Sequence, residues 1–229
     1  TTKEVIKLRD LCNKIINNKN YKKNIKKPKR SKHKLNSHSQ DNLIYNLQNK
    51  SYEFIKVATN KKIISVVKNY LNFGSYKQEQ INLYQLTARS PKEGGEQQTL
   101  HLDSRMPGLR FPIKIVVTVM LEKFDKKNGT TRLVPKSHLI PRFPQNKDEK
   151  LKNIKYVNGN PGDILIMNGS LWHAGSKNLT NNTRWGILIT YVRWFIKQAF
   201  DMPSSLPLNI KKQCNKHQLE LLGFYSKPP

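Results

Sequence analysis

From residue 75 onward, the chain is a series of short runs rich in Val, Ile, Leu, Tyr and Thr, separated by turn-forming pairs such as Asn128-Gly129 and Pro161-Gly162. Short apolar runs at this spacing are typical of an all-β sandwich or barrel, because each strand is brief and reverses direction at a turn. We expect strands at residues 81–88, 99–103, 113–121, 131–135, 154–157, 164–167 and 185–194. The sequence therefore predicts a mainly β core.

Helical patterns flank this core on both sides. Apolar side chains recur at the i, i+3, i+4, i+7 spacing in residues 1–18 and again in residues 51–72, which we expect to form one or two helices that end at Asn72-Phe73-Gly74. Residues 215–222 predict a terminal helix. A chain of 229 residues suits one domain. We therefore expect a single domain over residues 1–229, with a helical and basic flank (1–74), a β core (75–195) and a C-terminal extension (196–229).

The chain carries a formal net charge of +27, which attracts anions such as nucleic acid, an anionic surface or an acidic substrate. Residues 19–34, from Lys19 to Lys34, hold nine Lys and Arg and no acid, so we expect a loop or a mobile arm there. Two interpretations stay open: this basic arm binds nucleic acid, or the charge reflects a composition rich in Lys and Asn throughout. Tyr21 is the only aromatic residue of the arm, which leaves little surface for stacking on bases.

The sequence indicates neither a membrane span nor a secreted protein. No apolar run approaches the roughly 20 residues that a spanning helix needs. Residues 1–9 are polar and charged, so we expect no signal peptide. The two cysteines, Cys12 and Cys214, form no CxxC motif, which favours a reducing compartment and a cytoplasmic protein. The oligomeric state is left open.

Three residues have the types and the spacing of a metal site. His101 and Asp103 are two apart in a predicted strand, so their side chains point to the same face. His173 follows the apolar run at 164–167. Two histidines and one carboxylate are the facial triad of non-haem Fe(II) oxygenases, which leaves positions open for a 2-oxo acid and O2. A His-x-Asp pair alone is more often a hydrogen-bonded surface pair, so companion residues decide between the two interpretations.

Arg184 is the strongest companion of this triad. It follows His173 after a segment rich in turn-forming residues. We expect a hairpin that places Arg184 on the strand beside the one that carries His173. From there its guanidinium can hold a carboxylate through two parallel hydrogen bonds, as the distal carboxylate of 2-oxoglutarate requires.

Three stretches occur in a fixed order along the chain. They are Gln98-Thr99-Leu100-His101-Leu102-Asp103, the run from Asn128-Gly129 to Ser137-His138, and the run from Pro161-Gly162-Asp163 through Trp172-His173 to Thr183-Arg184-Trp185. Together they resemble the phytanoyl-CoA dioxygenase family of Fe(II)/2-oxoglutarate oxygenases, and with weaker similarity from residue 42 the resemblance covers residues 42–195.

This resemblance implies a double-stranded β-helix, a jelly-roll or cupin-like barrel. It also implies that His101, Asp103 and His173 bind Fe(II) and that Arg184 binds 2-oxoglutarate. Such family members hydroxylate an unactivated carbon with O2 and convert 2-oxoglutarate to succinate and CO2. One departure concerns the position two after the second histidine, where many members carry a small hydroxyl residue and this chain has Gly175. Another is Lys136, where the family has glycine.

Further residues are candidates for the pocket. Tyr84 and Thr118 lie on predicted strands from which they can reach the co-substrate, and an ordinary place in the core is the alternative. Arg105 and Arg110 follow Asp103 in a loop with Pro and Gly. This loop can close over the site and offer cations to an anionic substrate, and a solvated loop is the alternative.

The remaining histidines are expected to have no part in metal binding. His138 is expected to organise a loop near the barrel mouth, and His33, His38 and His217 are expected to face solvent. Gln98, at an odd separation from His101, is expected to face away from the pocket.

The leading hypothesis is therefore a small-molecule hydroxylase that uses Fe(II), 2-oxoglutarate and O2. The alternative is a basic nucleic-acid-binding protein or a nucleic-acid-directed oxygenase, supported by the arm at 19–34. A degenerate barrel that only binds ligands conflicts with the complete ligand set. A hydrolytic zinc site gives Arg184 no role.

Overall fold

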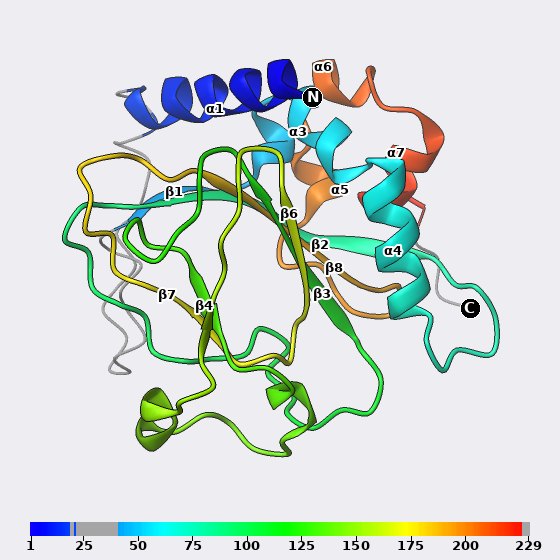
Figure 1. Cartoon of the computed structure of the whole chain (residues 1–229). Helices are drawn as coiled ribbons and strands as arrows, with labels where there is room; N and C mark the ends of the chain where they lie inside the picture. The colour runs from blue at the N-terminus through cyan, green and yellow to red at the C-terminus, as the bar shows by residue number, and fades with distance from the viewer. Residues whose placement is uncertain (19–20, 22–40, 226–229) are drawn as a thin grey trace.

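The computed structural model describes residues 1–18, 21 and 41–225 (Figure 1). Two antiparallel β-sheets lie against each other, a five-stranded sheet in the order β1-β2-β8-β3-β6 and a three-stranded sheet in the order β5-β4-β7. Helices precede and follow the strands along the chain. The expected β core with flanking helices is confirmed in this form, as a mixed α/β structure with two antiparallel sheets.

Six of the predicted strands are confirmed. The large sheet consists of β1 (Asp41–Ile44), β2 (Ile81–Pro91), β8 (Gly186–Arg193), β3 (Lys114–Met120) and β6 (Ile164–Asn168), and the small sheet of β5 (Lys155–Tyr156), β4 (Thr131–Leu133) and β7 (His173–Gly175). β1 was not predicted, and β7 was expected only as the strand that carries His173, without bounds. The predicted strand at 99–103 is wrong: His101 alone pairs there, in an isolated bridge with His173.

The three predicted helical regions are confirmed. The helices are α1 (Thr2–Asn17), α3 (Tyr52–Ala58), α4 (Lys61–Leu71), α5 (Met202–Ser205), α6 (Leu208–Lys211) and α7 (Lys216–Leu221), with short 3-10 turns at η2 (Leu47–Asn49), η3 (Ser137–Leu139) and η4 (Asn146–Lys150). Residues 51–72 form two helices because Asn60 starts the second one, its side chain accepting a hydrogen bond from the Lys62 amide. No helix in the described part of the chain is long and apolar enough to cross a membrane.

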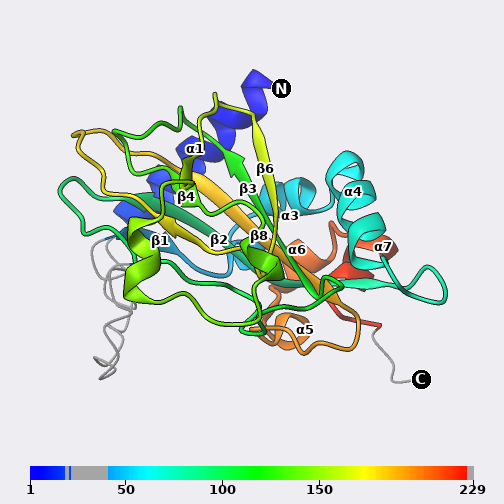
Figure 2. The ribbon, with the colours of Figure 1, turned by 60° about the horizontal axis from the view of Figure 1, so that its bottom comes forward.

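The large sheet has two different faces. Val117 of β3 and Ile189 of β8 belong to the main hydrophobic core, together with apolar residues of α1, α3, α4 and α7. Figures 1 and 2 show these helices on the side of the large sheet away from β4 and β7. Because strand side chains alternate, the neighbouring residues face the small sheet instead. The side chains on this inner face include Thr87, Arg89, Lys114, Thr118 and Thr190.

The small sheet turns its apolar side outward. Trp172 and Ala174 belong to a second buried cluster with Leu100 and Leu102. His173 lies between Trp172 and Ala174 in the chain, and His101 lies between Leu100 and Leu102. Because neighbouring side chains point to opposite faces, both imidazoles point inward, toward the large sheet.

The basic arm predicted at residues 19–34 lies outside the described residues except for Tyr21, and so do His33 and His38. The Tyr21 hydroxyl donates to the Leu43 carbonyl at 3.1 Å and accepts from the Tyr45 amide at 3.2 Å. The one aromatic side chain of the arm is therefore packed against β1.

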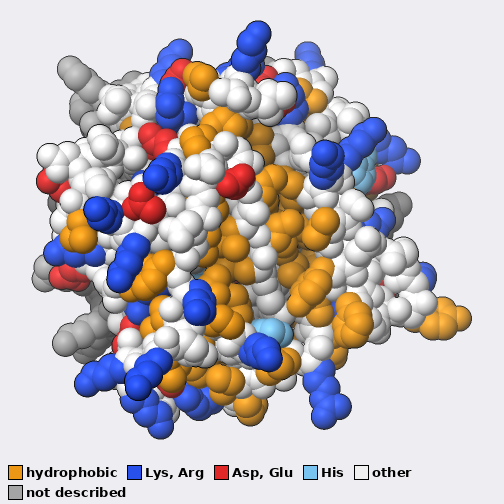
Figure 3. All heavy atoms as spheres, in the orientation of Figure 1, with side chains coloured by type: hydrophobic (Ala, Val, Ile, Leu, Met, Phe, Trp, Pro, Cys, Tyr) orange, Lys and Arg blue, Asp and Glu red, His pale blue; other side chains and the backbone are white. Residues whose placement is uncertain are grey.

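Figure 3 shows lysine and arginine side chains spread around one face of the molecule, with far fewer acidic ones and with apolar side chains gathered in the middle. Exposed apolar side chains among the described residues include Ile164 of β6 and Tyr70 of α4.

Candidate metal centre

His101, Asp103 and His173 come together between the two sheets. Their candidate ligand atoms all lie within 4.8 Å of one another. The His173 Nε2 atom is 3.6 Å from Oδ2 of Asp103, and the His101 Nε2 atom is 3.9 Å from Oδ1 of the same carboxylate. Among the described residues, this is the group of three with metal-ligand geometry, as the sequence predicted.

Hydrogen bonds orient both imidazoles. Nδ1 of His101 lies 3.0 Å from the Thr99 carbonyl oxygen, and Nδ1 of His173 lies 2.9 Å from that of Leu171. A carbonyl oxygen only accepts, so Nδ1 carries the proton in each ring. In the neutral form of each ring, Nε2 then carries no proton and faces Asp103, which is the arrangement that metal-binding histidines adopt.

The electrostatics of the site keep His101 neutral. Burial lowers its pKa to about 4, and the neighbouring His173 acts in the same direction. A neutral imidazole is the form that binds a metal ion. The backbone reinforces the pairing, because the amides of His101 and His173 each donate to the carbonyl of the other residue.

Arg184 lies just before β8 and is almost completely buried. The predicted hairpin is wrong. β7, with His173, belongs to the small sheet, and β8 belongs to the large one, so the two strands lie in different sheets. Arg184 still comes close to the inner face, because its Nη1 atom is 3.7 Å from the place where a Cβ atom of Gly186 would stand.

The Arg184 side chain has polar capacity that the described residues do not use. Its Nη2 atom donates to the Gly129 carbonyl, its guanidinium lies 4.0 Å from the centre of the Phe124 ring, and its buried Nε has no hydrogen-bond partner. Burial lowers its pKa to about 9, and the charge of Arg89 contributes. A buried guanidinium with an unpaired N–H is a suitable partner for a carboxylate ligand, so the site fits 2-oxoglutarate.

Arg89 is a residue that sequence reasoning missed. It lies on β2, opposite Gly186 of β8, and its guanidinium binds Asp41 at 2.6 Å and Oε1 of Gln98 at 2.9 Å. Its charge contributes to the lowered pKa of both Arg184 and His101. The predicted strand ended at residue 88, and extending the alternation of Thr87 by one step would have placed Arg89 on the inner face.

Two glycines make room for these arginines. A Cβ atom at Gly175 would lie 3.0 Å from Nη2 of Arg89 and 3.0 Å from Oε1 of Gln98. A Cβ atom at Gly186 would lie 2.9 Å from the Phe124 ring and 3.3 Å from the Thr118 methyl group. Gly175, noted above as a departure from the family pattern, is therefore the position where the Arg89 guanidinium approaches the small sheet.

The structure corrects the expectation for Gln98. Its Oε1 atom accepts from the Gly175 amide at 2.8 Å as well as from Arg89, which places it beside the pocket. The odd-separation argument fails because residues 99–103 are not a regular strand.

Thr118 and Tyr84 occupy different ends of the inner face. Thr118 is buried beside Gly186, near Arg184. A β-bulge between Leu83 and Gln85 places Tyr84 against Lys114, whose Nζ atom is 3.8 Å from the ring centre. Thr118 is therefore near the proposed co-substrate position, and Tyr84 is not.

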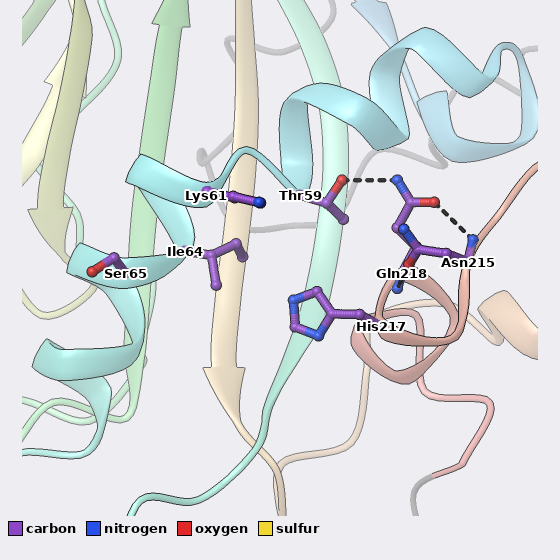
Figure 4. Close-up of a pocket in the computed structure, with 7 residues that line it drawn as sticks. All are labelled: Thr59, Lys61, Ile64, Ser65, Asn215, His217 and Gln218. Carbon is purple, nitrogen blue, oxygen red and sulfur yellow. Dashed lines mark hydrogen bonds between the residues drawn. The ribbon is translucent and has the colours of Figure 1, made fainter.

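The other candidate residues lie further out. Arg105 and Arg110 are both exposed, and Arg105 has a positive φ of 55°. His138 lies in η3 and is not part of the metal-ligand group. His217 lines a surface hollow of about 300 Å³ between α4 and α7, shown in Figure 4. This hollow is on the helical side of the large sheet, away from the triad.

Solved structures share this fold. HygX from Streptomyces hygroscopicus, solved with nickel and 2-oxoglutarate bound, matches with a TM-score of 0.64 over 86% of this chain and 81% of its own, at 16% identity. SnoN, a non-haem α-ketoglutarate-dependent epimerase from nogalamycin biosynthesis, matches with a TM-score of 0.53 over 66% of this chain and 60% of its own, at 19% identity. At this identity the likeness shows the shared fold.

Proteins similar to this chain in sequence are also named as dioxygenases. The multifunctional dioxygenase prhA of Penicillium brasilianum is 30% identical over 45% of this chain and 36% of its own length. The dioxygenase peniF of Penicillium patulum is 32% identical over 50% of this chain and 37% of its own length. The matched stretch thus spans just over a third of these relatives.

The sequence match to dioxygenases and the His-Asp-His group together define the class of non-haem iron dioxygenases that use 2-oxoglutarate. Within that class, the chain belongs to the phytanoyl-CoA dioxygenase (PhyH) family, whose sequence profile matches residues 1–186.

Proposed function

We propose that this chain is an Fe(II)- and 2-oxoglutarate-dependent dioxygenase that hydroxylates a small molecule and forms succinate and CO2. The observation that carries the proposal is the convergence of three ligand side chains, His101, Asp103 and His173, between two sheets whose inner face also has the buried guanidinium of Arg184 beside it. The two sheets would then be the halves of a double-stranded β-helix, with residues 1–229 acting as one domain.

Six residues between the sheets have a part in this proposal. His101, Asp103 and His173 would hold Fe(II), and Arg184 and Arg89 would hold the distal carboxylate of 2-oxoglutarate, with Thr118 beside it. When bound, the iron and 2-oxoglutarate supply the activation of O2. The buried clusters behind the two sheets would keep water away from those sides of the site.

A small molecule is the substrate class that the relatives favour. HygX has been solved with hygromycin B, a small molecule, bound beside nickel and 2-oxoglutarate. No observation of comparable weight favours nucleic acid, since Tyr21 is packed against β1.

Anaerobic spectroscopy tests the site. Fe(II) and 2-oxoglutarate together should give a weak visible charge-transfer band, and His173→Ala should abolish it. Admitting O2 with a panel of candidate substrates should then form succinate. A band that survives in both the His101→Ala and the His173→Ala variants would show that these histidines are not the ligands.

The outcome of the reaction is a separate test. With Asp103 as a third protein ligand, chloride has no vacant position, so we expect hydroxylation even in high chloride. Mass spectrometry under 18O2 should show a product that has gained one labelled oxygen. An isomer without labelled oxygen would indicate an epimerase, as SnoN is, and a chlorinated product would show that Asp103 does not bind the iron.

A further inference from the structure

Lys114 is a buried cation that the proposed reaction does not yet use. It begins β3 on the inner face and is 8% exposed. Its ammonium group donates to the backbone carbonyl of Asp103 at 3.0 Å and lies 3.8 Å from the centre of the Tyr84 ring. Within the described part of the chain, no carboxylate oxygen lies within ion-pair distance of it.

Such a position is unfavourable for a lysine without an anionic partner. Burying an ammonium group costs several kcal/mol unless a charge or hydrogen bonds compensate it. Arg105 lies two residues after Asp103, whose carbonyl Lys114 contacts, so a second positive charge is carried by the same loop. One carbonyl, one aromatic face and the Asp103 carboxylate beyond ion-pair distance leave the charge only partly balanced.

Lys114 and the arginines lie at opposite ends of the inner face. β3 runs from Lys114, paired with Val192, to Met120, paired with Gly186 beside Arg184 and Arg89. Six residues of strand separate these ends by about 20 Å. The triad lies between them, since Lys114 contacts the Asp103 carbonyl while Arg89 approaches Gly175, two residues after His173.

This geometry points to Lys114, with Tyr84 and Arg105, as a subsite for a compact anionic group of the primary substrate, either a carboxylate or a phosphate monoester. Because this substrate is the molecule oxidised at the iron centre, the inference rests on the proposed function. Arg184 and Arg89 are assigned to the distal carboxylate of 2-oxoglutarate. The anionic group of the substrate would therefore bind at the Lys114 end of the inner face.

The mouth of the site suggests the rest of the substrate. The loop between Asp103 and β3 carries Met106 and Phe111, which are 52% and 46% exposed. The hydroxyl of Ser104 binds the Met106 carbonyl at 3.3 Å and so helps to fix this loop beside the triad. A substrate with an apolar part next to its anionic group would cover these side chains.

Matched probes test the subsite without knowledge of the natural substrate. Protein loaded anaerobically with Fe(II) and 2-oxoglutarate is titrated with hexanoate, hexyl phosphate and hexan-1-ol, by calorimetry and by the change in the charge-transfer band. We expect at least one anion to bind about tenfold or more tightly than the alcohol. Which anion is preferred tells a carboxylate subsite from a phosphate subsite.

Variants assign the preference to Lys114. Lys114→Met should remove the preference for anions, and Lys114→Arg should retain it. Lys126→Met is the matched control, because Lys126 also lies over a tyrosine ring, 5.0 Å from the centre of Tyr156, but outside the site. An unchanged band in each variant reports intact folding and an intact iron site.

Two results would overturn the inference: equal or absent binding of the anions by the unaltered protein, or a preference that survives in Lys114→Met. In either case a normal charge-transfer band leaves the proposed dioxygenase function standing. Failure of the unaltered protein to form the band at all contradicts the proposed function itself.

Discussion

At the scale of single residues, the surroundings of Arg184 say most about the ligand. Its guanidinium is buried against Phe124 with one N–H unpaired, and no carboxylate of the described chain neutralises it at contact distance. An arginine is retained in such a place when a planar, two-oxygen anion binds there.

Arg184→Lys tests this role. The charge remains, but the paired hydrogen bonds of the guanidinium are lost, so we expect the Kd for 2-oxoglutarate to rise about tenfold or more while Fe(II) binding stays nearly intact. Anaerobic titration of the charge-transfer band measures the first, and metal analysis after dialysis measures the second. An unchanged Kd would remove Arg184 from the co-substrate site.

Arg89→Lys distinguishes co-substrate binding from a purely structural role. The unaltered protein should prefer 2-oxoglutarate over 2-oxopentanoate, which carries a methyl group in place of the distal carboxylate. Arg89→Lys should reduce this preference by about tenfold, since a lost charge-assisted hydrogen bond weakens binding of that carboxylate alone.

Arg132→Lys is the matched control for Arg89. Arg132 is also buried and paired with a carboxylate, Glu149, but it lies on β4 opposite Ala174, on the outward side of the small sheet. Equal loss of affinity for both 2-oxo acids in Arg89→Lys would mean that Arg89 only supports the fold.

The residue types of the triad and of Arg184 were readable from the sequence, because few chemistries need two histidines, a carboxylate and an arginine in that order. Arg89, Lys114 and Gln98 were not readable as site residues. Their positions depend on where β2 ends, on which face of β3 lies toward the small sheet, and on the irregular backbone around His101. These are tertiary features without a local pattern.

At the scale of elements, long amphipathic patterns predicted well and short segments did not. α1 and α4 were predicted because an apolar stripe persists over several turns. β7 is only three residues long, and it joins the small sheet, whereas the next strand, β8, joins the large one. Such a switch between sheets is decided by packing across the core, so the hairpin expected from the turn-rich segment did not form.

Two substitutions in α1 test how this helix is held. Leu8 is 4% exposed in the main core, while Ile6, on the same helix, is 43% exposed. We expect Leu8→Ala to lower the free energy of unfolding by about 2–5 kcal/mol and Ile6→Ala to change it by less than about 1 kcal/mol. Urea denaturation followed by circular dichroism measures both. Similar values for the two variants would mean that α1 does not pack on the core as described.

At the scale of the whole molecule, the dominant property is the net charge of +27. Figure 3 shows the positive side chains spread over the face in view, not confined to one groove. A dispersed charge of this kind gives weak, salt-sensitive attraction to any polyanion and no specific docking geometry.

Neutralising the basic arm tests whether it contributes to function. With four or more lysines of residues 19–34 changed to glutamine, we expect succinate formation to stay the same at low and at moderate salt. A gel-shift assay with single-stranded and double-stranded DNA should show only weak binding that disappears with salt, before and after the change. A selective loss of turnover at low salt would show instead that the arm steers an anionic substrate.

The histidines proposed to bind the metal and the arginines proposed to bind 2-oxoglutarate lie on different sheets, and this has a mechanical consequence. His173 belongs to the small sheet and His101 is bridged to it, whereas Arg89 lies on β2 and Arg184 just before β8, both in the large sheet. A 2-oxo acid held by iron at one end and by the arginines at the other would therefore span the gap like a cross-link. The two histidines would hold the metal from the small-sheet layer, and the bound co-substrate would link them to the arginines of the large sheet, so the substrate would meet a more rigid site.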